Sequence, residues 1–213
     1  MFHCVVESTD SATLLPAIHA LRSGAVVVLP TDTIYGLSAR IDRPRALQRI
    51  REIKGRQEMA PFLVLIPRLE ELAALTTRPP SQAVVDLLWP GPVTVLLPAR
   101  DNLPAPLVGP QGTVAVRWPA TPLVLAILEG LGLPIVSTSI NRSGGPPLLE
   151  PAAIAREFGA AIDVLVDSGP TPDAVASTVI DLTRDPPVIV RQGGRRIDLG
   201  ELEAAMEGDP TAP

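Results

Sequence analysis

Two polar clusters in this chain have the residue types needed to hold a nucleotide. Lys54-Gly55-Arg56 places two cations close together, which forms a compact positive site for phosphate oxygens. Residues 137–141, of sequence STSIN, offer hydroxyl and amide groups directly after an apolar run, and we expect them to form a loop. A further polar segment, Thr31-Asp32-Thr33, follows an earlier apolar run. Together the three clusters suggest an enzyme that handles a nucleotide.

Each cluster also has a structural interpretation when it is taken alone. Cations at a helix C-terminus interact favourably with the helix dipole, and Thr31 or Asp32 can cap a turn. The Ser, Asn and Gly residues of 137–145 can form a plain turn. The occurrence of all three clusters favours a ligand site, because open α/β sheets bind ligands beyond the carboxyl ends of strands. The chain has no GxxxxGK[ST] motif, which excludes a P-loop nucleotidase.

Two arginines end apolar runs that read as strands. Arg117 follows Thr113-Val114-Ala115-Val116, and Arg191 follows Val188-Ile189-Val190. An arginine in such a place needs a partner, which a ligand carboxylate or a structural Asp or Glu can provide. The isolated residues His3, His19 and Cys4 make no metal-binding pattern and no Cys-His nucleophile.

The composition describes a globular protein of 213 residues, with 46% hydrophobic and 19% charged residues. A net charge of −5 argues against nucleic acid as the main partner. A single cysteine excludes an internal disulfide and fits a reducing compartment. No apolar run has the length of a membrane span and no signal pattern opens the chain, so we expect a cytoplasmic location and no membrane association.

The hydrophobic pattern predicts alternating helices and short buried strands. We expect helices at 11–22, 45–54, 69–75, 82–88, 122–131, 151–158 and 199–206. We expect strands at 25–29, 62–66, 93–97, 114–116, 135–136, 164–166, 178–182 and 188–190. The alternation predicts a single α/β domain over 1–207, with a twisted mixed sheet flanked by helices and a flexible tail at 208–213. The last two strands follow each other without a helix, which indicates an antiparallel pair.

The chain resembles the YrdC-like (TsaC) family of L-threonylcarbamoyl-AMP synthases. The matching stretches are PTDTIYGL at 30–37, KGR at 54–56, LWPGPVTVLLPA at 88–99, TVAVRWP at 113–119, PIVSTSIN at 134–141, STVIDL at 177–182 and VRQGG at 190–194. They occur in the family's order and cover nearly the whole chain. The resemblance implies a twisted α/β sheet with a large positively charged cavity, in the single-domain form of the family.

The resemblance also implies a reaction. L-Threonine, bicarbonate or carbon dioxide, and ATP with Mg²⁺ would give threonylcarbamoyl-AMP and pyrophosphate. The product would feed a separate tRNA threonylcarbamoyl-transferase complex that modifies adenosine 37 of tRNA, with at most weak tRNA binding by this chain itself. We expect no metal ligand from the protein's side chains.

The family's roles map onto individual residues of this chain. The KxR…SxN signature is Lys54, Arg56, Ser139 and Asn141, which the resemblance makes the catalytic set. The implied ATP contacts are Lys54, Arg56, Thr113, Ser139 and Arg191. The implied threonine contacts are Thr31, Arg117, Ser137 and Ser177, with Arg117 placed for the carboxylate. The Gly- and Pro-rich segment 142–149 is a candidate lid over the site.

The chain departs from the family pattern around the phosphate-binding segment. Gln57 stands where many members have Pro, Ala60 where a polar residue is usual, Phe62 where Leu is usual and Asp32 where Glu is common. Two alternatives therefore stay open: an RNA-binding or ribosome-associated protein, and a carbamoyl-adenylating enzyme with another acceptor. The acidic net charge argues against the first, and the presence of Thr31, Ser137 and Ser177 argues against the second.

Overall fold

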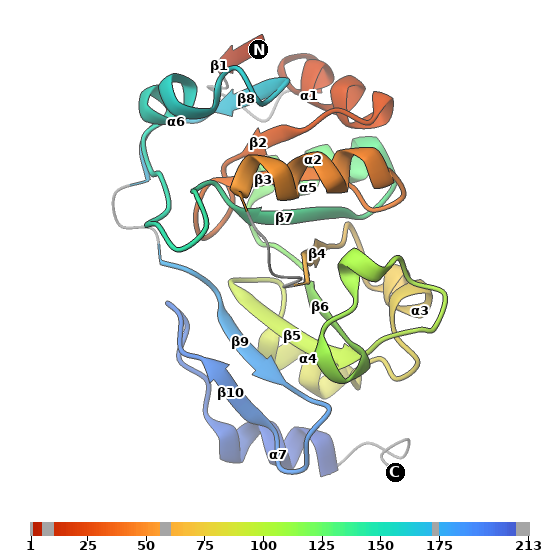
Figure 1. Cartoon of the computed structure of the whole chain (residues 1–213). Helices are drawn as coiled ribbons and strands as arrows, with labels where there is room; N and C mark the ends of the chain where they lie inside the picture. Colours follow the sequence, from red (N-terminus) through yellow and green to blue (C-terminus); the bar gives the residue numbers. More distant parts are fainter. Residues whose placement is uncertain (1, 6–10, 56–60, 172–174, 208–213) are drawn as a thin grey trace.

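One mixed sheet crosses the whole molecule in a computed structural model that describes residues 2–5, 11–55, 61–171 and 175–207. Its order is β1-β8-β2-β3-β7-β4-β6-β5-β9-β10 (Figure 1). The strands are β1 Phe2–Val5, β2 Val27–Leu29, β3 Gly36–Arg40, β4 Leu63–Leu65, β5 Val93–Pro98, β6 Thr113–Arg117, β7 Ile135–Ser139, β8 Val164–Asp167, β9 Thr178–Asp181 and β10 Val188–Arg191. The sheet has four parallel pairs (β1–β8, β2–β8, β4–β6, β5–β9), and its other pairs are antiparallel, which confirms the predicted mixed α/β sheet.

Helices cover the sheet at the predicted places. They are α1 Ser11–Ser23, α2 Pro44–Lys54, α3 Leu72–Leu75, α4 Gln82–Leu88, α5 Pro122–Leu131, α6 Pro151–Phe158 and α7 Leu199–Glu207. Short 3₁₀ turns occupy Leu69–Glu71, Ala105–Leu107 and Pro110–Gly112, so the single helix predicted at 69–75 is a 3₁₀ turn followed by α3. Helices α1 and α5 pack against each other over one half of the sheet, and α4 packs against α7 near the other end (Figure 1).

Helix α2 carries one of the predicted site residues at its last turn. Pro44 starts the helix, where its missing N–H leaves no bond unmade, and Leu47, Ile50 and Ile53 are buried against the core. Gly55 ends it with φ 62°, a left-handed conformation that glycine adopts without strain. Lys54 therefore lies at a sharply defined helix end and is itself buried.

Two strands, β1 and β3, were not predicted, and the end of a third was assigned wrongly. The pattern did not predict β3, because Gly36, Ser38 and Arg40 interrupt its apolar residues, although β3 is paired on both sides by β2 and β7. Residues 137–139 are the end of strand β7, not a loop after it. Pairing with β3 on one side and β4 on the other holds these small polar residues in extended conformation.

No helix in the described ranges is long and apolar enough to cross a membrane. The predicted tail at 208–213 lies outside the described residues, and the cytoplasmic location stays a prediction. The late pair β9–β10 is antiparallel, as predicted.

Candidate active site

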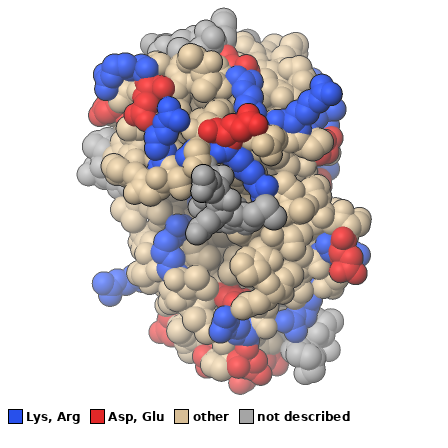
Figure 2. Space-filling model, viewed as in Figure 1, with Lys and Arg blue, Asp and Glu red and all other residues tan. Residues whose placement is uncertain are grey.

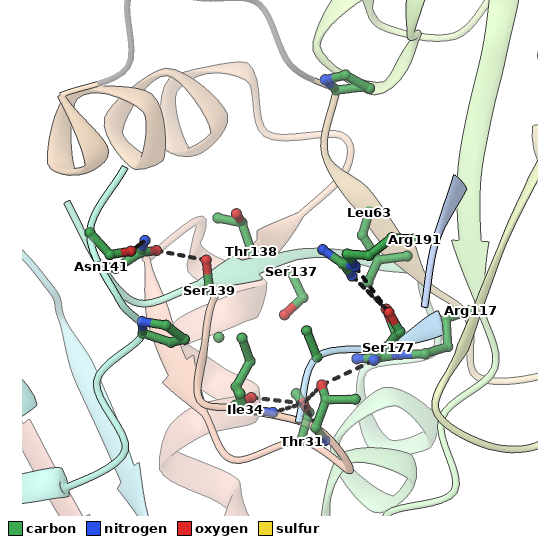
Figure 3. Close-up of a pocket in the computed structure, with 16 residues that line it drawn as sticks. Thr31, Ile34, Leu63, Arg117, Ser137, Thr138, Ser139, Asn141, Ser177 and Arg191 are labelled. Carbon is green, nitrogen blue, oxygen red and sulfur yellow. Dashed lines mark hydrogen bonds between the residues drawn. The ribbon is translucent and has the colours of Figure 1, made fainter. Parts of the chain in front are cut away.

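A cavity of about 440 Å³ opens between the two halves of the sheet (Figure 3). It is lined by Thr31, Thr33, Ile34, Gly36, Pro61, Leu63, Arg117, Ser137, Thr138, Ser139, Asn141, Gly145, Pro147, Ala176, Ser177 and Arg191. These residues come from the loop after β2, the starts of β3 and β4, the ends of β6, β7 and β10, the segment after β7 and the segment that enters β9. Segments from most of the chain length therefore meet at one place, and seven of the ten predicted site residues line it.

Arg117 presents a buried cation to the cavity. Its Nη1 donates to Thr33 Oγ1 at 3.1 Å, and its Nη2 lies 3.6 Å from Asp32 Oδ1. Its Nε is buried without a hydrogen-bond partner in the described part of the chain. Burial lowers the pKa of the Arg117 guanidinium, Asp32 opposes that change, and nearby Arg191 lowers the pKa further. The incompletely paired guanidinium is suited to an anionic ligand, while Asp32 supplies the structural partner that the sequence left open.

Thr31 and Thr33, in the loop after β2, make different hydrogen bonds. The Thr31 hydroxyl accepts from the backbone N–H of Thr33 and Ile34 and donates to Ile34 O at 2.8 Å, so it also shapes the turn. The Thr33 hydroxyl lies 2.9 Å from that of Thr31 and accepts from Arg117. Thr33 belongs to the polar segment Thr31-Asp32-Thr33 that the sequence indicated, but it was assigned no role of its own, although it lines the cavity.

Lys54, Ser139 and Asn141 form one connected unit. Lys54 Nζ donates to Ser139 O and to Asn141 Oδ1, both at 2.6 Å. The Ser139 hydroxyl also donates to Asn141 Oδ1 at 2.6 Å, and Asn141 Nδ2 donates to Gly145 O at 2.6 Å. Lys54 is not among the lining residues, so in this structure its ammonium holds the cavity wall in place. Arg56, Gln57 and Ala60 lie outside the described residues.

Arg191 joins the two last strands at the cavity. Its Nε and Nη2 donate to Ser177 O at 3.1 and 2.9 Å, and Nη2 also donates to Ser177 Oγ at 3.1 Å. Close approach of the following segment to β9 depends on Gly193, because a Cβ there would collide with the backbone of Ala176 and Thr178. Gly193 thus allows the close approach that places Arg191 within hydrogen-bond distance of Ser177.

A second glycine makes room for a predicted threonine contact. A Cβ at Gly36 would collide with Ser137 Oγ, which lies across the β3–β7 pair. Ser137 pairs with Ser38 in the β3–β7 register, and its hydroxyl lines the cavity in the space that a side chain at the diagonal neighbour Gly36 would fill.

Thr113 is a predicted site residue that the structure does not bring to the cavity wall. It starts β6, is buried, and its hydroxyl donates to Pro110 O at 3.3 Å. Its implied contact with ATP stays a prediction.

The chemical character of the cavity is cationic and rich in hydroxyl groups. Among the described lining residues, the charged side chains are Arg117 and Arg191, and none is a carboxylate. The described chain contains no cluster of three or more His, Cys, Asp or Glu that could hold a metal ion. The site can bind an anion with several oxygen atoms and position it, without a side-chain nucleophile. The molecule is thus an α/β protein with a polar, arginine-lined ligand cavity in a twisted mixed sheet.

Comparison with known proteins defines the family. Residues 19–193 match the Sua5/YciO/YrdC family model, whose description reads "Telomere recombination". The chain belongs to this family. It is 39% identical over 188 residues to the threonylcarbamoyl-AMP synthase of Pyrococcus abyssi, covering 87% of this chain and 55% of that protein. It is 37% identical over 202 residues to the threonylcarbamoyl-AMP synthase of Bacillus subtilis, covering 93% and 58% respectively.

A solved structure gives the same fold. The crystal structure of P. abyssi Sua5 complexed with L-threonine superposes with a TM-score of 0.85 at 35% identity, covering 96% of this chain and 60% of that one. The predicted fold class is confirmed by this match. The chain spans less than two thirds of the length of both curated relatives named above.

Proposed function

We propose that this protein is an L-threonylcarbamoyl-AMP synthase that uses L-threonine, bicarbonate or carbon dioxide, and ATP. The observation that carries the proposal is the single cavity onto which Arg117, Ser137 and Ser177 converge with Ser139, Asn141 and Arg191. Relatives bearing that name over most of this chain's length add support. The relative solved with L-threonine has the same fold, which supports threonine as the amino-acid substrate.

The two substrates occupy different parts of the cavity in this proposal. Threonine lies with its carboxylate at Arg117, whose unpartnered Nε can complete a forked pair of hydrogen bonds. The nucleotide lies toward Ser139, Asn141 and Arg191, with Arg56 as a further phosphate contact. Lys54 acts mainly by fixing Ser139 and Asn141, because its ammonium already donates short hydrogen bonds to both.

The chemistry needs positioning more than a strong side-chain base. The neutral threonine amine attacks carbon dioxide, forming an N–C bond and releasing one proton to solvent. A carbamate oxygen then attacks the α-phosphorus of ATP, and the bond to the β-phosphate oxygen breaks as pyrophosphate leaves. Aligned substrates and fixed hydrogen-bond donors lower the barrier to both steps.

Mg²⁺ enters this proposal as part of the nucleotide substrate. Triphosphate oxygens would hold the ion, because Mg²⁺ prefers hard oxygen ligands and commonly binds through substrate phosphates. Bound Mg²⁺ neutralises phosphate charge. The product would be consumed by a separate transferase complex that modifies adenosine 37 of tRNA.

Little supports RNA binding as the main activity. On the face shown in Figure 2, Lys and Arg side chains are interspersed with Asp and Glu and do not form a continuous stripe. The chain's net charge of −5 points the same way.

Pyrophosphate release from ATP tests the proposed reaction. Release should require both L-threonine and bicarbonate and should be absent with either one alone. Release with a different amino acid in place of threonine would indicate another acceptor. Salt-sensitive tRNA binding without any ATP turnover would instead support the RNA-binding alternative.

A further inference from the structure

The hydroxyl of Ser177 contacts a buried residue behind the cavity wall, Thr94. Thr94 lies on β5, which runs parallel to β9, and its Oγ1 is 2.8 Å from Ser177 Oγ. Thr94 is 4% exposed and does not line the cavity, whereas Ser177 does. Thr94 therefore does not touch a ligand directly, and its hydrogen bond to Ser177 is the contact that links it to the cavity.

The proton on each of these two hydroxyls can be assigned. Arg191 Nη2 can only donate, so Ser177 Oγ uses one acceptor position on it. The contact with Ser177 is the one hydrogen bond that the Thr94 hydroxyl makes within the described structure. If Ser177 donated to Thr94, the buried Thr94 proton would have no acceptor, which is unfavourable. If Thr94 donates to Ser177, the Thr94 proton has an acceptor, and the Ser177 proton is left to point into the cavity that Ser177 lines.

We propose that Thr94 is a positioning residue that, together with Arg191, makes Ser177 a hydrogen-bond donor toward the ligand. With both acceptor positions of Ser177 filled, its hydroxyl accepts nothing from the cavity and can only donate into it. The group it recognises is an acceptor oxygen of an anionic ligand. Ser177, Arg191 and Arg117 lie on the same side of the cavity in Figure 3, which makes this a donor-only wall.

The donor role of Ser177 adds an orientation for the substrate, and the identity of that substrate as threonine rests on the proposed function. Arg117 and the donor hydroxyl of Ser177 accept the carboxylate of threonine and disfavour its amine, while Arg191 holds Ser177 in place from the nucleotide side. The amine then points away from Arg117, toward the part of the cavity lined by Ser137 and Ser139, where carbon dioxide and the nucleotide must meet it.

Neutron diffraction from a crystal of the free protein exchanged into D₂O tests the proton assignment without any substrate. The Thr94 deuteron should lie between the two oxygens and the Ser177 deuteron should point into the cavity. A Ser177 deuteron on the line to Thr94 Oγ1 would overturn the proposal. This measurement stands whether or not the protein makes threonylcarbamoyl-AMP, so its failure differs from failure of the proposed function.

Kinetics of matched variants test the effect on the ligand. Thr94→Val, which keeps the shape and removes the hydroxyl, should raise KM for threonine about three- to tenfold, the range for one neutral hydrogen bond, and leave KM for ATP nearly unchanged. Thr94→Ser should behave like the wild type. In a Ser177→Ala background, Thr94→Val should have no further effect. An equal rise in KM in that background would show that Thr94 acts by another route and would overturn the proposal.

Discussion

Lys54 Nζ donates a 2.6 Å hydrogen bond to Asn141 Oδ1, which ties the end of α2 to the segment that follows β7. The same ammonium donates to Ser139 O, so one buried cation fixes two lining residues. The lysine of the KxR motif is thus in direct contact with the serine and the asparagine of the SxN motif. It joins the first half of the signature to the second through a buried, charge-assisted network.

Replacing Lys54 should therefore cost both stability and activity. We expect Lys54→Met to lower the free energy of unfolding by about 1.5 to 3 kcal/mol, because hydrogen bonds from a charged donor to buried acceptors are lost. Product formation should fall at least about 100-fold, since Ser139 and Asn141 lose their support. Urea unfolding and a pyrophosphate assay measure the two effects. Arg45→Met, at an exposed position of the same helix, is the control and should change neither; a fully active Lys54→Met variant would contradict the role assigned here.

Gly36→Ala should damage the site without touching a polar group. A Cβ at this position collides with Ser137 Oγ, so Ser137 or strand β7 must shift. We expect KM for threonine to rise more than KM for ATP, because the shift is centred on Ser137. Steady-state kinetics with each substrate varied would measure this. Gly200→Ala, in the exposed first turn of α7, serves as the matched substitution and should leave both constants unchanged.

Arg117→Lys should raise KM for threonine by at least about tenfold. A lysine keeps the positive charge but loses the planar fork that can bind a carboxylate with two hydrogen bonds. It also loses the bond to Thr33, which is 3.1 Å long in the native protein. Arg68→Lys at the exposed ion pair with Glu71 is the control. Wild-type threonine affinity in Arg117→Lys would place the carboxylate elsewhere.

Asp181 should contribute to the acid sensitivity of the fold. Burial raises the pKa of its carboxyl, but hydrogen bonds from Thr183 and Arg184 outweigh that effect and leave the pKa below its ordinary value. Because the folded pKa is depressed, this stabilisation is present above the unfolded pKa of about 3.9 and is lost as pH falls through the folded value.

Urea unfolding as a function of pH tests that sign. The wild-type free energy of unfolding should fall as pH drops below about 4, and Asp181→Asn should show a shallower fall over the same range. Asp101→Asn, at an exposed position, should retain the wild-type slope. An unchanged slope in Asp181→Asn would contradict the assignment.

The segment 142–149 should become protected when both substrates bind. Gly145 and Pro147 line the cavity, and Gly145 O accepts a hydrogen bond from Asn141 Nδ2. A ligand bound at Asn141 would therefore touch the residue that anchors this segment. We expect trypsin cleavage after Arg142, whose side chain is 64% exposed, to slow on adding ATP and threonine. Unchanged cleavage would argue against a closing lid.

Most helices could be predicted from the sequence because their ends carry strong local signals. Helix α5 begins at Pro122 and ends before Gly132, which has φ 73°, and the predicted and observed bounds agree. Strand β3 could not be predicted, because Gly36 and Ser38 are held in the sheet by β2 and β7 and not by their own propensity.

Seven of the ten expected site residues line one cavity, but the sequence did not predict how these residues contact one another. Ser137 and Ser139 were expected in a loop but lie in β7, since pairing on both sides overrides the low strand propensity of serine. Lys54 was expected to face a ligand, and its bonds to Ser139 and Asn141 depend on a tertiary contact that spacing alone does not reveal. Thr94 was missed because it acts through Ser177, a partner distant in sequence.

If the proposed reaction is right, this protein joins threonine, inorganic carbon and ATP in one product. Incubation with ATP, L-threonine and ¹³C-bicarbonate, followed by mass spectrometry, is the decisive experiment. We expect a product with the mass of threonylcarbamoyl-AMP that carries one ¹³C atom, in step with pyrophosphate release. Pyrophosphate release without a labelled product, or no nucleotide turnover at all, would contradict it.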